Sequence, residues 1–222
     1  MGNKGVGGKD RKPNSNKCFP KKHLNQNPYK YYFTHVSNML LNRNQLIVLS
    51  EFSQDYYKRV YGRDIAKKHK LNQKTVSNIL LKLEKENILK FETQGKNKYY
   101  FLNRFNPNIS EIIKLIEINK KITFLNKHKR FIELFKELEK RTNGTLIIFG
   151  SYAKGSEHED SDLDLFALGN IQEVKDLEKM YNLKINILKS KKIDKEETIF
   201  KEIINNHIIL KGEDDFINKI KW

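Results

Sequence analysis

One stretch, IIFGSYAKGSEHEDSDLDL at residues 147–165, constrains this chain more than any other. An apolar run predicts a buried strand, which breaks at Gly150 and Ser151. The stretch ends in an Asp-Leu-Asp-Leu alternation that predicts a second short strand. Because strand side chains repeat every second residue, Asp162 and Asp164 should lie on one face. Two carboxylates on one face form a hard-oxygen site that suits Mg²⁺.

The same stretch resembles the signature of the minimal nucleotidyltransferases of the DNA polymerase β superfamily, which is an apolar strand, Gly-Ser, a spacer and Asp-apolar-Asp-apolar. The resemblance implies Mg²⁺-dependent transfer of a nucleoside monophosphate from a nucleoside triphosphate (NTP) to an acceptor hydroxyl. It implies that Gly150 and Ser151 hold the nucleotide phosphates, with Lys154 as a further contact. Asp162 and Asp164 would be the catalytic residues and would hold two Mg²⁺ ions.

The third carboxylate of that family is missing from the position where we expect it. In the family it lies on a neighbouring strand, here predicted at residues 183–188, and the residue on the site face is Asn186, with Lys184 next to it on that face. An amide adds no charge and cannot act as a base, so the second Mg²⁺ should bind weakly. Three outcomes stay open: turnover with one ion, replacement by a loop acid, or nucleotide binding without turnover. The loop acids are Glu157, Glu159 and Asp160.

The positive charge is concentrated in the first half of the chain, whose formal net charge is +16. Residues 1–33 have eight Lys/Arg against one acid, residues 34–107 fourteen against six, and residues 108–222 twenty-one against twenty. An excess confined to one half indicates a polyanionic partner for that half. A single cysteine excludes a disulfide framework, and neither a secretory signal nor a bilayer-spanning run is present, so we expect a cytoplasmic protein without membrane contact.

Residues 34–107 follow the order helix, helix, helix, hairpin. We expect helices at 44–52 (with Leu46, Ile47 and Leu49 inward), at 62–70 and from 72 to about 86, then two β-prone runs around a glycine turn. This order resembles the winged helix-turn-helix of MarR- and ArsR-like transcription factors, with the runs DIAKKHKL and TVSNILLKLE. The resemblance implies double-stranded DNA as partner; the alternative is a dimerisation or protein-binding module, which the positive charge disfavours. The expected DNA contacts are Gln73, Lys74, Ser77, Asn78, Lys96 and Lys98.

The remaining segments complete an α+β fold in four parts. Residues 1–33 should be a flexible basic tail, whose aromatic cluster at 29–33 either packs on the next domain or stacks on bases. Residues 108–142 should be a helical linker that ends with Gly144 as its C-terminal cap. Residues 143–222 should form a nucleotidyltransferase-like mixed sheet covered by helices. We expect its helices at 171–181, 196–205 and 214–221, and strands at 183–188 and 207–210.

An apolar stripe in the linker leaves two interpretations open. Phe131, Leu134, Phe135 and Leu138 fall at helical spacing. The stripe could be the seam of a homodimer or could pack between the two domains, and we favour packing.

Two functions compete at this point. The first is an enzyme that transfers a nucleoside monophosphate to an unknown acceptor. The second is a DNA-binding regulator whose nucleotidyltransferase-like domain binds nucleotide or a partner without turnover. A third, an antitoxin of the kind that pairs with HEPN proteins, is less favoured because those antitoxins usually lack a winged helix.

Overall fold

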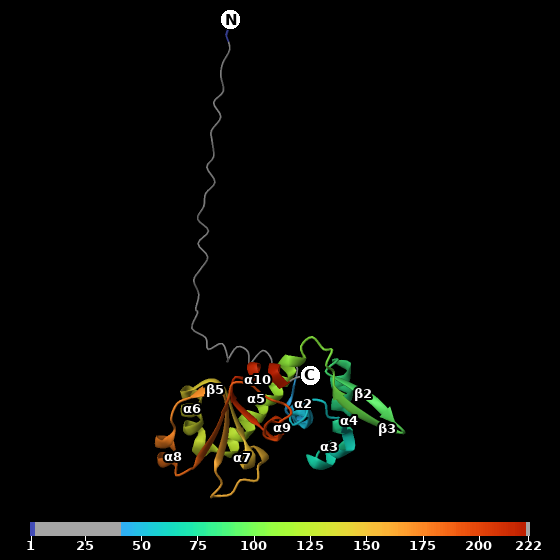
Figure 1. Ribbon diagram of the computed structural model, residues 1–222. Coiled ribbons are helices and arrows are strands. Elements are labelled where there is room, and N and C mark those ends of the chain that lie inside the picture. Colours follow the sequence, from blue (N-terminus) through green and yellow to red (C-terminus); the bar gives the residue numbers. More distant parts are fainter. Residues whose placement is uncertain (3–40, 221–222) are drawn as a thin grey trace. The chain divides into compact units, whose positions relative to one another are not determined.

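The computed structural model describes residues 1–2 and 41–220 (Figure 1). The predicted basic tail and its aromatic cluster at 29–33 lie outside the described residues, apart from the first two. Residues 41–222 form one compact unit. Within the described ranges, no helix combines the length and the apolar composition that crossing a bilayer requires.

The first part of this unit has the predicted winged-helix order. β3 lies between β1 and β2 in an antiparallel sheet, and the β2–β3 hairpin, which we call the wing, turns through Gly95 and Lys96. β1 was not predicted, because two residues are too short to show a period. The elements are α2 (Arg43–Leu49), the 3-10 turn η1 (Ser50–Phe52), β1 (Val60–Tyr61), α3 (Gly62–Lys68), α4 (Gln73–Lys85), β2 (Leu89–Gln94) and β3 (Asn97–Leu102).

Helix α4 follows its sequence closely. The Asn72 side chain caps it by accepting a hydrogen bond from the Lys74 backbone N–H at 2.8 Å. The predicted inward positions are all buried: Val76, Ile79, Leu80 and Leu83.

Helix α2 differs from its predicted orientation. Leu49 is buried as expected, but Val48 and Gln45 are buried in place of Leu46 and Ile47, which are only partly so. The reason is a capping box: the Asn42 side chain accepts from the Gln45 N–H, and the Gln45 side chain accepts from the Asn42 N–H. This box holds Gln45 against the core.

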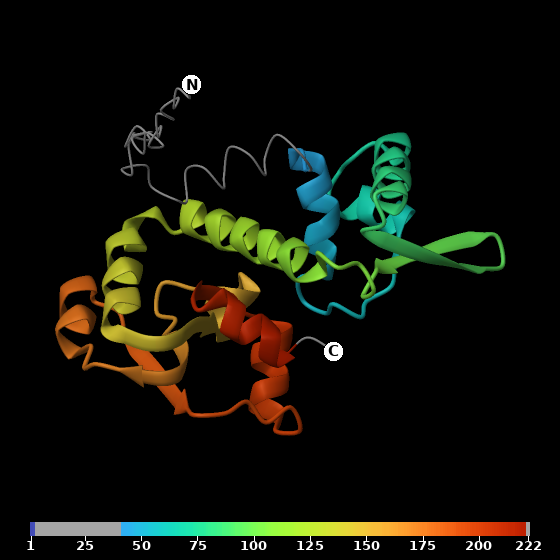
Figure 2. The same cartoon turned by 90° about the horizontal axis from the view of Figure 1, so that it is seen from above.

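The predicted linker forms two helices, α5 (Ile109–Lys127) and α6 (Ile132–Arg141), with the 3-10 turn η2 (Lys129–Phe131) between them. Figure 2 shows α5 running from the winged-helix part towards the second sheet. The stripe is buried in the core of that second sheet, together with Leu146 and Tyr152. Because these side chains of η2 and α6 are buried within that core, the stripe is neither a dimer seam nor packing between domains.

The second sheet is mixed, as predicted. Its strand order is β6-β5-β4-β7, with β5 and β6 parallel and the other pairs antiparallel. The predicted helix at 171–181 begins only at Lys175, because Ile171 is the last residue of β5. The elements are β4 (Thr142–Phe149), α7 (Gly150–Lys154), β5 (Leu163–Ile171), α8 (Lys175–Tyr181), β6 (Ile185–Ser190), α9 (Thr198–Asn205), β7 (Ile208–Lys211) and α10 (Glu213–Ile220).

Gly144 is not a helix cap, so that prediction was wrong. It lies inside β4 directly opposite Gly169 of β5, with φ of +115° and +127° at the two glycines. A Cβ on Gly144 would lie 2.3 Å from the Leu168 carbonyl oxygen. The glycine pair thus lets two strand backbones approach closely.

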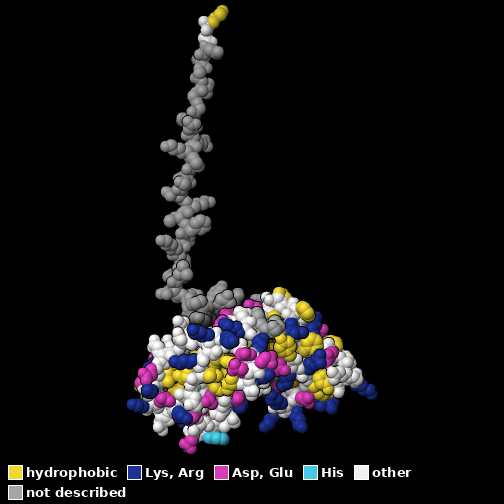
Figure 3. All heavy atoms as spheres, viewed as in Figure 1, with side chains coloured by type: hydrophobic (Ala, Val, Ile, Leu, Met, Phe, Trp, Pro, Cys, Tyr) yellow, Lys and Arg dark blue, Asp and Glu magenta, His cyan; other side chains and the backbone are white. Residues whose placement is uncertain are grey.

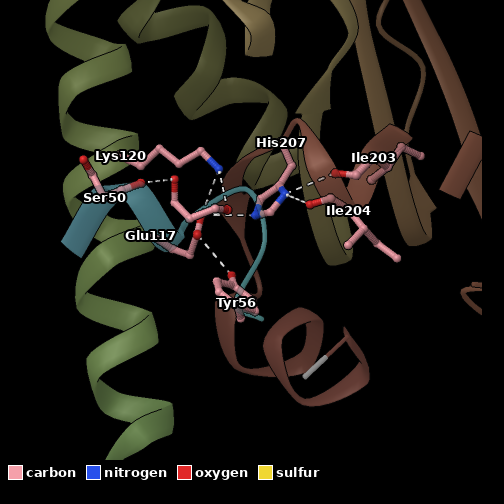
Figure 4. Close-up of polar contacts among 8 residues, drawn as sticks. Ser50, Tyr56, Glu117, Lys120, Ile203, Ile204 and His207 are labelled. Carbon is pink, nitrogen blue, oxygen red and sulfur yellow. Dashed lines mark hydrogen bonds and ion pairs between the residues drawn. The ribbon is translucent and has the colours of Figure 1, made fainter. Parts of the chain in front are cut away.

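A buried polar network joins the winged-helix part to the second sheet (Figure 4). Glu117 of α5 accepts a hydrogen bond from the Tyr56 hydroxyl at 3.0 Å. Its carboxylate also lies 3.2 Å from Nε2 of His207, which directly precedes β7, and 3.4 Å from Nζ of Lys120. Burial alone would raise the pKa of Glu117, but Lys120, His207 and the Tyr56 hydroxyl offset this and hold its pKa below the ordinary value.

Candidate functional site

The two motif carboxylates lie side by side at the start of β5. Asp164 pairs in register with Asn186 of the parallel strand β6, and Asp162 lies just before β5. The Asn186 amide nitrogen donates to Asp162 at 3.2 Å and to Asp164 at 3.0 Å. One side chain therefore reaches both carboxylates, which places all three residues on one face. We call Asp162 and Asp164 the acid pair.

Gly150 is required by the position of Asp164. It has a φ of +66°, and a Cβ built on it would lie 2.2 Å from a carboxylate oxygen of Asp164. Any side chain here would displace that carboxylate and strain the backbone. Ser151 follows directly in the short helix α7, so the Gly-Ser turn and the acid pair form one local structure.

A lysine neutralises part of the acid pair. Lys184 Nζ lies 2.6 Å from Asp162, and the predicted face of residues 184 and 186 is thus the observed one. The hydrogen bond from Lys184, with help from Asn186, lowers the pKa of Asp162 below its ordinary value. The same contact raises the pKa of Lys184. The sequence had shown Lys184 as a poor metal ligand, but its ion pair with Asp162 was not predicted.

Within the described ranges, no third acid joins the pair, because no group of three His, Cys, Asp or Glu side chains is close enough to hold a metal ion. Glu157, one of the loop acids, instead contacts Lys127 at 2.5 Å and His128 at 3.5 Å. Burial would raise the pKa of Glu157, but the hydrogen bond from Lys127 lowers it overall. Glu157 is therefore held in its own ion pair.

The donor set fits one Mg²⁺ ion better than two. Mg²⁺ is commonly held by one or two carboxylates, with phosphate and water oxygens completing the shell. The acid pair supplies two carboxylates. The Asn186 amide oxygen would become a third ligand if the amide group rotated so that this oxygen, instead of the nitrogen, faced the acid pair. Lys184 opposes the binding of a further cation by its charge.

Lys154 is engaged elsewhere. Its ammonium lies 2.6 Å from Glu202 of α9. To contact a nucleotide phosphate it would have to leave this exposed ion pair, which costs little because such pairs contribute about 0–1 kcal/mol.

The predicted DNA-contacting residues form two exposed groups on the winged-helix part. Gln73, Lys74, Ser77 and Asn78 are exposed in the first half of α4. Lys96 and Lys98 are exposed on the wing, and Lys98 Nζ lies 4.1 Å from the centre of the Phe91 ring. Figure 3 shows Lys and Arg side chains gathered along the lower edge of this part. Polar N-terminal helix residues beside basic wing residues suit a nucleic-acid surface.

One comparison with known protein families matches the second half of the chain. Residues 128–221 match the family model described as nucleotidyltransferase domain, so this part of the chain is a nucleotidyltransferase domain. The first half has the fold of a winged helix-turn-helix. A comparison with curated proteins gave no match.

Solved structures similar to the chain include a homodimeric winged helix-turn-helix DNA-binding domain from Mycobacterium bovis (17% identity, 45% of this chain and 88% of that chain, TM-score 0.31). The adhesin competence repressor from Streptococcus pyogenes is also similar (23% identity, 51% and 83%, TM-score 0.35). A toxin–antitoxin structure with AMP-PNP is similar too (18% identity, 46% and 81%, TM-score 0.28).

Proposed function

We propose that this protein is a nucleotidyltransferase that transfers a nucleoside monophosphate from an NTP to an acceptor hydroxyl with Mg²⁺. The observation that carries the proposal is the acid pair packed against Gly150 within a nucleotidyltransferase domain. Two adjacent carboxylates repel each other, and a divalent cation would neutralise both. Their value lies in binding a cation.

The residues would act in two places. The Gly150–Ser151 turn would hold the nucleotide phosphates, and the acid pair would hold Mg²⁺, joined by the Asn186 amide oxygen if that amide group rotated. When bound, Mg²⁺ would supply charge neutralisation at the phosphates and would favour deprotonation of the acceptor hydroxyl. The acceptor hydroxyl would lose its proton to water, and its oxygen would bond to the α-phosphorus as the bond from that phosphorus to the β-phosphate oxygen breaks and pyrophosphate leaves. Lys184 would release Asp162 when the ion binds.

A second function is favoured by the same site. Asn186 adds no negative charge, and Lys184 already neutralises Asp162. Both features weaken Mg²⁺ binding, which would leave a DNA-binding regulator that senses nucleotide or binds a partner without turnover.

Incubation with α-labelled NTPs and Mg²⁺ should label the acceptor or release pyrophosphate with the wild-type chain. The double variant Asp162→Asn/Asp164→Asn should lower this rate by about 100-fold or more, because it removes both charged metal ligands. The control is Glu173→Gln, which changes an exposed acid just beyond the opposite end of β5.

Equal rates for wild type and double variant would rule out the enzyme. Nucleotide binding that needs the acid pair, without any transfer, would support the regulator instead.

We also propose that the winged-helix part binds double-stranded DNA. The support is the net positive charge of residues 34–107 and the exposure of the α4 and wing residues. Self-association as a homodimer stays a prediction, which sedimentation analysis of the full chain would test.

Duplex binding should weaken steeply with salt, because phosphate contacts release counterions. Lys96→Ala should reduce the salt slope by about 1, and Gln73→Ala or Asn78→Ala should cost about 1–3 kcal/mol at preferred sequences and relax the preference. Filter or polarisation titrations over a range of salt concentrations measure both effects.

Lys179→Ala, an exposed lysine of α8, is the control and should leave the slope unchanged. Absence of duplex binding at low salt would contradict the assignment of this domain as a DNA reader.

A further inference from the structure

A cavity of about 860 Å³ lies at the base of the wing. We call it the wing-base pocket. Its walls come from the segment before β1, the start of β2 and the end of β3 with the loop that follows, at residues 55–59, 90–91 and 101–105. The expected DNA contacts on α4 and at the wing tip do not line it. Its volume falls within the range of small-ligand sites.

The pocket combines exposed aromatic rings with cations. Tyr57 is 52% exposed and Phe105 is 92% exposed, and both line this pocket. Arg104 lies with its guanidinium 5.2 Å from the centre of the Tyr57 ring. Lys90 adds positive charge, as does Arg59, whose Nε lies 3.1 Å from the Glu92 carboxylate. Asp55 is the acid of the lining, and its carboxylate accepts the Tyr57 backbone N–H at 2.8 Å.

Phe105 is held outward by an anchored loop. The buried Asn103 side chain donates to the backbone carbonyl and side-chain oxygen of Asn87, each at 2.9 Å. Asn106 donates to the same carbonyl at 3.0 Å, and Asn103 accepts from the Phe105 N–H at 3.3 Å. The loop is thus fixed on both sides of Phe105. Because the backbone is already fixed, the ordering cost of binding is limited to the side-chain torsions of Phe105.

We propose that the wing-base pocket binds a nucleotide of an unpaired nucleic-acid strand, in addition to the duplex site on α4 and the wing. A base would stack on Phe105 or Tyr57, and its phosphates would contact Arg59, Lys90 or Arg104. Stacking platforms beside cations are the usual way in which proteins hold single strands. The N-terminal tail of this chain is an unsuitable occupant, because residues 1–33 carry an excess of positive charge themselves.

The test is fluorescence polarisation of the full chain with a labelled single-stranded oligothymidine and, separately, a duplex. Phe105→Ala should weaken single-strand binding by about 5- to 100-fold, the usual effect of losing a stacked base, and leave duplex binding unchanged. The variant should fold normally because Phe105 is exposed. The matched control is Met180→Ala, a 72% exposed apolar residue of α8, which should change neither.

Two further measurements test whether the pocket also binds free nucleotides and whether a lysine contributes to strand binding. Thymidine monophosphate should displace the strand at concentrations where inorganic phosphate does not, if the pocket also accepts free nucleotides. Lys90→Glu should weaken single-strand binding as well. Equal single-strand affinity of Phe105→Ala, Met180→Ala and wild type would overturn the proposal, and so would an equal loss for strand and duplex.

Discussion

Replacing Glu117 by Ala is expected to lower the free energy of unfolding by about 3–5 kcal/mol, the usual cost of leaving buried charges without their partner. Glu117 is 1% exposed, and its removal leaves His207 and Lys120 without their carboxylate and Tyr56 without its acceptor. For a unit of this size the loss corresponds to about 6–20 °C in melting temperature. Thermal unfolding followed by circular dichroism measures it.

Glu111→Ala is the matched control, since Glu111 is an exposed acid on the same helix. It should change stability by less than about 0.5 kcal/mol. A melting temperature of Glu117→Ala equal to that of Glu111→Ala would show that the network does not hold the two parts together.

Lowering the pH should reduce the contribution of Glu117 to the free energy of unfolding. Because the folded protein holds the pKa of Glu117 below its ordinary value, its carboxylate stabilises the fold above the unfolded-state pKa of about 4.3. This stability is lost as pH falls through the lower folded-state pKa. The stability difference between wild type and Glu117→Gln should therefore be constant near neutral pH and shrink under acidic conditions.

Local sequence patterns correctly predicted the helices and strands whose apolar side chains lie on one face. The apolar period of α4, its Asn72 cap and the glycine turn of the wing are all short-range signals. Gly144 follows a helix, a local pattern that predicts a helix cap, whereas its partner in the structure is Gly169 on another strand. Such pairing is non-local, and a single sequence does not contain it.

In the candidate site, too, features that follow from local sequence were predicted and features that depend on contacts between distant segments were not. Strand alternation predicted that Asp162, Asp164 and Asn186 share a face, because that depends only on period and on which strands are neighbours. The ion pair between Lys184 and Asp162 was missed, since it depends on the parallel register of β5 and β6. The Glu117 network was missed for the same reason, as it joins segments far apart in the chain.

Replacing Asn186 by Asp should make the stability of the protein depend on Mg²⁺. The change places a third carboxylate within reach of Asp162 and Asp164, whose oxygens now accept hydrogen bonds from the Asn186 amide at 3.2 and 3.0 Å. Without a cation the three negative charges repel one another, so the melting temperature should fall. With Mg²⁺ it should recover, and half-maximal stabilisation should need about 10- to 100-fold less Mg²⁺ than in the wild type.

Asn182→Asp is the control. Asn182 is exposed at the end of α8, so this substitution makes the same chemical change away from the acid pair. If both variants respond to Mg²⁺ alike, the acid pair does not form the metal site. If Asn186→Asp alone gains Mg²⁺ affinity and its nucleotide transfer rises too, the missing carboxylate limits catalysis in the natural chain. Gained affinity with no transfer would instead mean that a complete ligand set is insufficient for turnover, so the missing carboxylate is not what limits catalysis.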